Sequence, residues 1–196
     1  MILAAGQASR FRAAAGEAGP ATKLVALLEG EPLVRHVAQA ALASRARPVV
    51  VVTGHAEDAV RAALHGLPLT FVHNPDYATG IASSIRRGLA EVPSDCDGAL
   101  VLLGDMPLVG ADIIDALIDA FDGRPEAKAA APLREGQRGN PVLLSRALFP
   151  ALARITGDAG ARALLAAAQG DVIEVEVDSP AVTFDVDTPE ALASKD

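Results

Sequence analysis

The stretch "ILAAGQASRF", residues 2–11, places a short apolar run directly before a glycine, small polar residues and an arginine. The apolar run predicts a short first strand over residues 2–5. Gly6 lets the backbone turn tightly toward a ligand, Ser9 offers a hydroxyl donor, and Arg10 offers a planar fork that matches phosphate oxygens. The stretch lacks the three spaced glycines of a dinucleotide fingerprint and the Gly-Lys pair of a Walker A loop. It fits either the phosphates of a mononucleotide or an ordinary strand-to-helix turn with a solvated arginine.

Outward from this stretch, strand-like runs alternate with helical patterns. Short aliphatic runs bounded by turn residues predict buried strands at residues 49–53, 69–72 and 99–103. Apolar residues recur at helical spacing in three intervening groups, which are Leu33, Val34, Val37, Ala41 and Leu42; Ile81, Ile85 and Leu89; and Ile113, Ile114, Leu117 and Phe121. This alternation is typical of an α/β fold with a three-layer, doubly wound (Rossmann-like), mostly parallel sheet.

The last third of the chain is less regular. It predicts strands at residues 141–144, 172–177 and 183–186, and helices at residues 146–152 and 160–168. We therefore expect mixed or antiparallel strands at one side of the sheet. Gly and Pro predict a loop over residues 17–22. Since no repeat or linker divides the sequence, we expect a single domain over residues 1–196.

Composition excludes several function classes. A formal charge of −8 and an aromatic content of 3% argue against a nucleic-acid partner, which needs a basic face and base-stacking side chains. No apolar run approaches the roughly 20 residues that span a bilayer, so no membrane partner is expected. The single Cys96 cannot form an internal disulfide, and a cytoplasmic location is the simplest expectation.

Carboxylates follow two of the predicted strands, where ligands bind in open α/β sheets. Asp105 comes directly after the most apolar predicted strand, where it can hold Mg²⁺ or cap a turn. Asp185 and Asp187 alternate onto one face if the strand at residues 183–186 continues, so either can be a second metal ligand. Alternatively, Asp187 compensates the dipole of a helix that begins at Pro189.

Taken together, the motifs resemble the MobA-like nucleotidyltransferase family of molybdenum-cofactor biosynthesis, in particular its molybdenum cofactor cytidylyltransferase branch. The segments that carry the resemblance cover nearly the whole chain in order: "LAAGQASR" with Lys23, "PLVRHVAQAAL", "VVVVTGH", "NPDYATGIASSIRRGL", "LVLLGDMPLV", "RGNPVLLSRALFP", "TGDAGARALL" and "FDVDTPEAL".

The resemblance implies an Mg²⁺-dependent transfer in which a phosphate oxygen of molybdopterin attacks the α-phosphorus of CTP and pyrophosphate leaves. It implies Arg10, Lys23 and Asp105 as catalytic residues, with Asp105 and Asp187 binding Mg²⁺. The implied nucleotide-binding residues are Leu3, Ala4, Ala5, Gly6, Ser9, Arg10, Lys23, Asn74, Gly80 and Ser84. "RGNP" and "GDAGAR" would face the acceptor, which divides the domain into a nucleotide-binding part at about residues 1–110 and an acceptor-binding part at about residues 111–196.

The sequence also departs from the family pattern, notably at Asn140 of "RGNP", where a histidine is frequent, and before Lys23, and it leaves rival functions open. Phe11, Arg12 and an Ala/Gly-rich insertion stand between Arg10 and Lys23, where the family has a short link. Ala5 resembles the cytidylyltransferase form, whereas guanylyltransferases carry a second glycine there. The alternatives are a GTP-using molybdopterin guanylyltransferase or another small phosphate-acceptor nucleotidyltransferase, and a non-catalytic cofactor carrier or maturation factor for a molybdenum hydroxylase.

Overall fold

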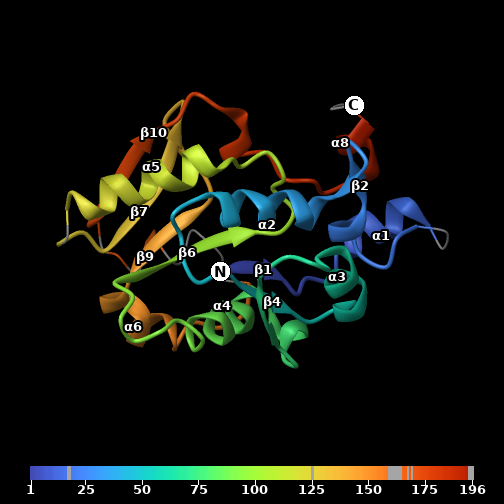
Figure 1. Ribbon diagram of the computed structural model, residues 1–196, viewed down its shortest axis with the longest axis horizontal. Helices are drawn as coiled ribbons and strands as arrows, with labels where there is room; N and C mark the ends of the chain where they lie inside the picture. Colours follow the sequence, from blue (N-terminus) through green and yellow to red (C-terminus); the bar gives the residue numbers. More distant parts are fainter. Residues whose placement is uncertain (17–18, 125, 159–164, 167, 169, 194–196) are drawn as a thin grey trace.

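The sheet at the centre of the molecule is assembled from eight strands in the computed structural model, which describes residues 1–16, 19–124, 126–158, 165–166, 168 and 170–193 (Figure 1). Its strands are β1 (Ile2–Ala4), β4 (Val50–Thr53), β5 (Thr70–His73), β6 (Gly98–Leu103), β7 (Ala129–Arg134), β8 (Gln137–Arg138), β9 (Val142–Ser145) and β10 (Val172–Glu176). A separate two-stranded sheet joins β2 (Leu27–Leu28) to β3 (Glu31–Pro32).

The order of hydrogen-bonded strands is β10, β7, β9, β6, β1, β4 and β5, and β8 pairs with β7. Strand β1 pairs in parallel with both β4 and β6, and β4 pairs in parallel with β5. In the last third of the chain, β9 runs antiparallel to β6 and β7, whereas β10 is parallel to β7. The predicted mostly parallel sheet with mixed strands at one side is confirmed.

Helices cover both faces of this sheet, which confirms the three-layer fold (Figure 1). The helices are α1 (Ser9–Ala15), α2 (Leu33–Ala43), α3 (Glu57–Ala63), α4 (Ile81–Leu89), α5 (Ala111–Asp122), α6 (Phe149–Leu152) and α8 (Pro189–Ala193). Side chains of α2, α3 and α5 pack on one face together with Ile2 and Ala4 of β1. Leu3 points to the opposite face, where α4 and α6 pack. Adjacent residues of β1 thus place their side chains in two separate cores, because successive side chains of a strand point to opposite faces of the sheet.

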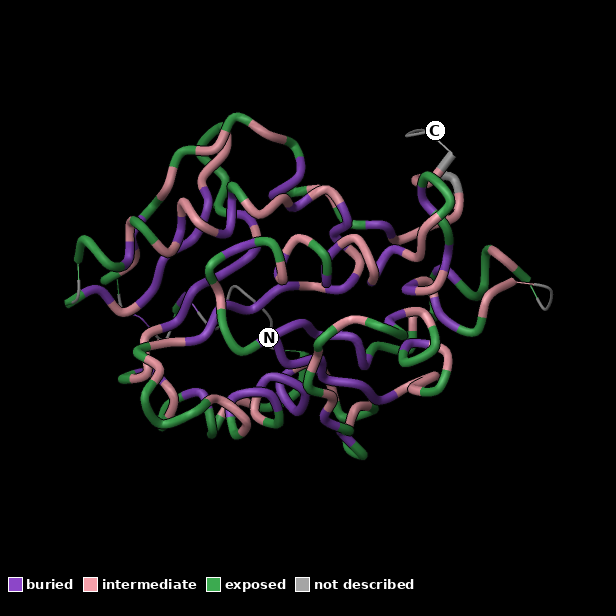
Figure 2. The backbone as a smooth tube through the Cα atoms, in the orientation of Figure 1, coloured by how far each residue is buried: buried purple, intermediate pink, exposed green. Residues whose placement is uncertain are grey.

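A third apolar cluster lies outside these two cores. It joins Phe11 of α1, Leu28 of β2 and Leu33 of α2 to Val186, which follows the short 3₁₀ helix η4 (Pro180–Val182). Val186 is fully buried. Figure 2 shows buried backbone running through the sheet and into this region beside α8. The cluster therefore ties a segment near residue 186 to the first helix of the chain.

Two predicted elements differ from the structure, and strand β7 was missed. Residues 183–186 form no strand, because Val186 donates its N–H to the carbonyl oxygen of Asp105 at 3.0 Å instead of joining the sheet. The predicted helix at residues 146–152 is divided into the 3₁₀ helix η3 (Arg146–Leu148) and α6. Strand β7 was not predicted, since its sequence "AAAPLR" is poor in β-branched residues.

Two predictions fall partly outside the described residues. Within the predicted helix at residues 160–168, residues 165 and 166 are helical, and residues 160–164 and 167 lie outside the described part. The predicted loop at residues 17–22 is confirmed for residues 19–22, and residues 17–18 lie outside it. Over the ranges that the structure covers, no helix has the length and apolar character needed to cross a bilayer.

Candidate nucleotide and metal site

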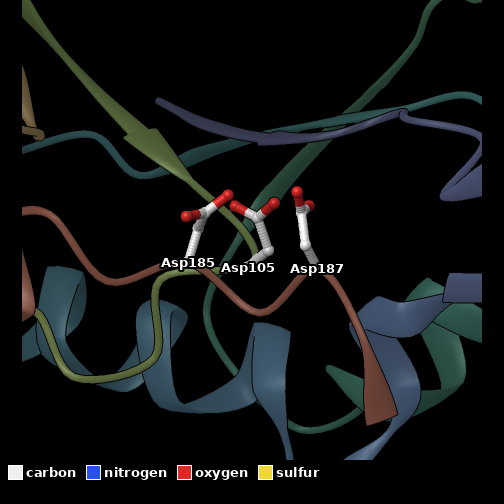
Figure 3. A group of neighbouring side chains, drawn as sticks. All are labelled: Asp105, Asp185 and Asp187. Atoms are coloured by element: carbon white, nitrogen blue, oxygen red, sulfur yellow. The ribbon is translucent and has the colours of Figure 1, made fainter. Parts of the chain in front are cut away.

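Three aspartates converge beyond the end of β6. Asp105 follows the strand directly, whereas Asp185 and Asp187 lie on the segment between η4 and α8. Figure 3 shows the three carboxylates side by side, pointing in the same direction. One oxygen atom from each carboxylate lies within 4.8 Å of those of the other two. Both candidates for the second metal ligand are thus close to Asp105.

Val186 explains why its two neighbours face the site. Its side chain is buried in the third apolar cluster with Phe11 and Leu33. Its N–H holds the carbonyl oxygen of Asp105, so the segment is pinned to the end of β6. Asp185 and Asp187 flank this anchor, and both carboxylates remain near Asp105 although the segment is not a strand. The sequence prediction thus reached a correct proximity from an incorrect secondary structure.

Lys23 lies among these carboxylates despite the insertion that precedes it. Its ammonium nitrogen Nζ is 2.7 Å from Oδ2 of Asp105 and 2.9 Å from Oδ1 of Asp187. The Lys23 side chain is 13% exposed. Thr22, which is buried, starts the 3₁₀ helix η1 (Lys23–Val25) and accepts the N–H of Leu24 with its hydroxyl oxygen. The start of η1 therefore places the ammonium group at the strand ends.

Arg10 contacts the same carboxylate from the solvent side. Its NH1 nitrogen is 2.5 Å from Oδ2 of Asp187, and its side chain is 80% exposed. Since Lys23 binds Oδ1 and Arg10 binds Oδ2, each oxygen of Asp187 has one cationic partner. Because an exposed salt bridge contributes little free energy, Arg10 can exchange Asp187 for a phosphate at a small cost in free energy.

The pKa values of the cluster follow from these contacts. Burial lowers the pKa of Lys23, but the charges and hydrogen bonds of Asp105 and Asp187 outweigh burial, so this pKa is raised. The hydrogen bond from Lys23 lowers the pKa of Asp187, with further help from the charges of Lys23 and Arg10. Burial raises the pKa of Asp185, and the neighbouring charges of Asp187 and Asp105 raise it further. The surroundings of Asp185 therefore disfavour its ionised form, whereas those of Asp187 favour it.

The donor set fits a divalent cation. Hard cations such as Mg²⁺ and Mn²⁺ take carboxylate oxygens together with water and substrate phosphates. The three carboxylates can supply such oxygens, and a cation bound there would neutralise their combined negative charge.

A cavity of about 420 Å³ adjoins the carboxylates. Eight residues named from the sequence line it, namely Leu3, Ala5, Gly6, Ser9, Lys23, Gly80, Ser84 and Asp105. A Cβ atom at Gly6 would meet no atom within 4 Å, so the glycine leaves open space beside the cavity. Ala8 has a positive φ of 50°, which marks strain in this loop. The residues expected to surround a nucleotide thus share one hollow.

Gly80 is required by a close approach of two backbone segments. Its φ is +110°, and a Cβ atom there would lie 2.3 Å from the carbonyl carbon of Gly157. The N–H of Ala82 donates to the carbonyl oxygen of Gly157 at 3.1 Å. This contact carries Asp158 to the cavity, where it is one of the lining residues. The first two residues of "GDAGAR" therefore lie at the nucleotide site, and residues 159–162 lie outside the described part.

Several residues named from the sequence do not line the cavity, namely Ala4, Arg10, Asn74 and Asp187. Ala4 belongs to β1, and its side chain is buried in the core with α2, α3 and α5. Asn74 is 2% exposed, and its amide nitrogen donates to the hydroxyls of Ser83 and Ser84. Its carbonyl oxygen accepts the N–H of Asp76 at 3.0 Å. Asn74 thus shapes the loop before α4, and its polar atoms are used within the protein.

Sequence reasoning missed Gln7, Tyr77, Ala78, Ile81 and Asp158 as lining residues, together with the apolar Ala8, Leu24 and Leu103. Tyr77 belongs to the 3₁₀ helix η2 (Tyr77–Thr79), between Asn74 and Gly80, which were both named from the sequence as nucleotide-binding residues. It is the only tyrosine of the chain, and this was the feature of the sequence that could have marked it as a candidate lining residue. Asp158 gave no such signal, because its segment was assigned to the acceptor.

A glycine-containing loop, cationic side chains and a carboxylate cluster meet at the carboxyl ends of a mostly parallel sheet, which is the arrangement of an α/β nucleotidyltransferase. More narrowly, the chain belongs to the family of the MobA-like NTP transferase domain, whose sequence model matches residues 1–172. The resemblance predicted from the motifs is confirmed.

Known proteins with similar sequences fall into two groups. The chain is 39% identical over 124 residues to the bifunctional protein GlmU of Aromatoleum aromaticum, covering 63% of this chain and 25% of that protein. It is 32% identical over 124 residues to the molybdenum cofactor cytidylyltransferase of Escherichia coli, covering 62% of this chain and 59% of that protein. The chain thus spans about a quarter of the GlmU relative and less than two thirds of the other.

Solved structures match over nearly the full length. Rv0371c from Mycobacterium tuberculosis H37Rv superposes with a TM-score of 0.83 at 27% identity, covering 98% of this chain and 94% of that one. A structure of the same protein in complex with manganese gives a TM-score of 0.78 at 26% identity, covering 99% and 95%.

Proposed function

We propose that this protein transfers a cytidylyl group from CTP to the terminal phosphate of molybdopterin, with Mg²⁺ as the cofactor. The observation that carries the proposal is the convergence of Lys23 with Asp105 and Asp187 beside the cavity that Gly6 and Ser9 line. The similarity to a molybdenum cofactor cytidylyltransferase supports the substrate pair. The manganese complex of the similar Rv0371c supports a divalent cation.

In the proposed mechanism the protein acts by positioning and by neutralising charge. A divalent cation bound by Asp105, with Asp187 or Asp185, would neutralise charge on the nucleotide phosphates. Lys23 and Arg10 hold phosphate oxygens of the triphosphate and stabilise the charge that develops on the pyrophosphate as it leaves. A phosphate oxygen of the acceptor attacks the α-phosphorus, and the bond to the bridging oxygen of the pyrophosphate breaks.

The acceptor belongs to the second half of the chain in this proposal, at about residues 111–196. Asp158 brings that half to the nucleotide cavity. A second cavity of about 870 Å³ is lined by Arg138, Gly139 and Asn140 of "RGNP". Arg138 is held by Glu174, with 2.7 Å between its NH2 nitrogen and the carboxylate. This surface offers amide and guanidinium donors to a polar acceptor.

The test is to incubate the full chain with Mg²⁺, molybdopterin and each nucleoside triphosphate in turn, and to measure pyrophosphate. Release of pyrophosphate that requires both CTP and molybdopterin is expected. If GTP is the only nucleotide that supports pyrophosphate release, the reaction is guanylyl transfer and not cytidylyl transfer. Binding of nucleotide without any pyrophosphate release would contradict catalysis and favour the carrier function.

A further inference from the structure

A third cavity, of about 660 Å³, adjoins the nucleotide cavity on the side of α1. Ser9 lines both hollows. His55, which follows β4, lines the third cavity and donates its backbone N–H to the carbonyl oxygen of Ala5 at 3.1 Å. Its ring centroid is 6.0 Å from that of Tyr77, which lines the nucleotide cavity. The two cavities are therefore neighbours, with Ser9 in the lining of both.

Arg12 and His55 face each other in this third cavity. The NH1 nitrogen of Arg12 lies 3.0 Å from Nε2 of His55. Because a guanidinium can only donate, Nε2 must accept, and the imidazole in this contact is neutral. The contact uses one of the five N–H donors of Arg12, and Nδ1 of His55 keeps its own hydrogen. Several donors from two separate elements thus remain available at one place.

The charge of Arg12 is not offset in the part of the chain that the structure describes. There Arg10, Arg45 and Arg61 each contact a carboxylate, whereas Arg12 contacts only the imidazole. The chain has 25 acidic residues against 17 lysines and arginines, so a shortage of acids does not explain this. The remaining described lining of the cavity consists of glycine, proline, alanine and Ser9, without an acid.

The other two cations at the site already have anionic partners. Lys23 contacts Asp105 and Asp187, and Arg10 contacts Asp187. In the free protein, Arg12 is thus the described cation around the glycine loop that has no carboxylate partner to exchange when a phosphate binds. A guanidinium, an imidazole N–H and a hydroxyl are donors that bind phosphate oxygens.

We propose that Arg12 and His55 form a polyphosphate subsite, which binds the outer phosphates of the nucleotide and then the leaving pyrophosphate. This inference rests on the proposed function for the identity of its ligand. The nucleotide phosphates run from the carboxylate cluster past Ser9 into the third cavity, where Arg12 and His55 hold the terminal oxygens. Arg12 occupies the position after Arg10 and Phe11 where the family pattern leads into a short link, so the subsite belongs to this chain's own insertion.

The test measures binding without turnover. Inorganic pyrophosphate and CMP are titrated separately into the full chain with Mg²⁺ by calorimetry. For Arg12→Ala we expect the dissociation constant of pyrophosphate to rise about tenfold or more, and for His55→Ala a smaller rise in the same direction. The affinity for CMP, which lacks the outer phosphates, should stay within about twofold in both variants.

Arg61→Ala is the matched control, since this arginine lies on α3 just after His55, contacts Glu57 and stacks over Phe71 at 4.6 Å. It should leave pyrophosphate binding unchanged. The subsite would be overturned if Arg61→Ala lost as much pyrophosphate affinity as Arg12→Ala, or if the Arg12 and His55 variants lost as much affinity for CMP. Unchanged pyrophosphate affinity in the variants that fold would also overturn it. If Arg12→Ala does not fold, as judged by circular dichroism, His55→Ala decides. The proposed function can fail separately. If Arg12→Ala loses pyrophosphate binding but the native protein transfers no cytidylyl group, the proposed function is overturned and the subsite stands.

Discussion

The ammonium nitrogen of Lys23 lies 2.7 Å from a carboxylate oxygen of Asp105, so the cation that we propose for phosphate binding and the anion that we propose for metal binding are each other's partners in the free protein. The contact is largely shielded, with the two side chains 13% and 19% exposed. In the proposed function, substrate binding exchanges this pair for two others, in which Lys23 contacts phosphate and Asp105 contacts the metal.

Asp105→Asn should reduce pyrophosphate release by about 100-fold or more, because an amide is a much poorer ligand for Mg²⁺ than a carboxylate. The fold should survive, since Asp105 lies in a loop after β6 and its backbone bond to Val186 does not involve the side chain. Pyrophosphate release and circular dichroism check the two expectations. Full metal-dependent activity in the variant would contradict the role of Asp105.

Lys23→Ala should have opposite effects on the two ligands. Nucleotide should bind more weakly and turnover should fall, because a cation on the departing phosphates is lost. Mn²⁺ should bind the nucleotide-free protein more tightly, because Lys23 no longer competes for Asp105 and Asp187. Electron paramagnetic resonance of free Mn²⁺ measures this affinity. Lys128→Ala, which removes a lysine paired with Asp171, serves as the control and should change neither.

Asp185 and Asp187 should affect stability with opposite signs. The pKa of Asp187 is lowered in the folded state by Lys23, so its contribution is present above the ordinary value of 3.8 and is lost as the pH falls through the folded pKa. The pKa of Asp185 is raised by burial, so its penalty is absent below 3.8 and complete once the pH has risen through the folded pKa.

At pH 7 without metal, Asp187→Asn should therefore lower the free energy of unfolding and Asp185→Asn should raise it. Both differences from the native protein should shrink as the pH approaches 3. Urea unfolding in the presence of a chelator between pH 3 and pH 7 measures them. Changes of the same sign at pH 7 would show that the two carboxylates do not differ as their surroundings indicate.

Gly80→Ala should destabilise the protein more than Gly136→Ala. Both glycines have a positive φ, +110° and +77°, and the ψ of 167° at Gly80 puts it in a region that is essentially restricted to glycine, where an alanine costs about 1–3 kcal/mol. At Gly136 a Cβ atom would meet nothing within 4 Å, whereas at Gly80 it would collide with the backbone of Gly157. Overpacking adds about 1–3 kcal/mol. Thermal unfolding of the two variants separates backbone strain from the collision, and equal midpoints would contradict it.

Ala5→Gly should weaken the preference for CTP over GTP. Ala5 lines the nucleotide cavity, and its methyl group is the atom that a Cβ at Gly54 would meet at 2.8 Å, so the space around it is narrow. Removing the methyl group should admit a purine more readily, by roughly 1–3 kcal/mol or less. Pyrophosphate release with each nucleotide at equal concentration measures the ratio. An unchanged ratio would show that the base is selected elsewhere, with Tyr77 the next residue to examine.

The parallel half of the fold could be predicted because its strands are buried on both faces and appear as continuous aliphatic runs. Strand β7 could not, since alanine and proline have low strand propensity and only pairing with β9 and β10 gives the segment its conformation. Residues 183–186 have the alternation of a strand but no neighbouring strand edge. The burial of Val186 beside Phe11 decides their path instead.

The carboxylates of the site could be predicted from the rule that ligands lie at strand ends, but the choice between Asp185 and Asp187 could not, because the structure brings both to Asp105. The reach of Lys23 was equally hidden, since the Ala/Gly-rich insertion before it has no periodicity. Contacts between residues distant in sequence, such as that of Gly80 with Gly157, could not be predicted, because the glycines themselves are the only sign of them in the sequence.

The hydrogen bond between Lys23 and Asp187 joins residues 164 positions apart in the chain. On a ribosome, the glycine loop, α1 and the first parallel strands emerge long before the segment that carries Asp185 and Asp187. Until that segment arrives, Phe11 and Leu33 lack the covering side chain of Val186, and Lys23 lacks one of its two partners. Long-range closure of this kind is a late and slow event in folding. The growing chain thus contains both Lys23 and Asp105 before Asp185 and Asp187 have been synthesised, so the cluster of three carboxylates is completed last.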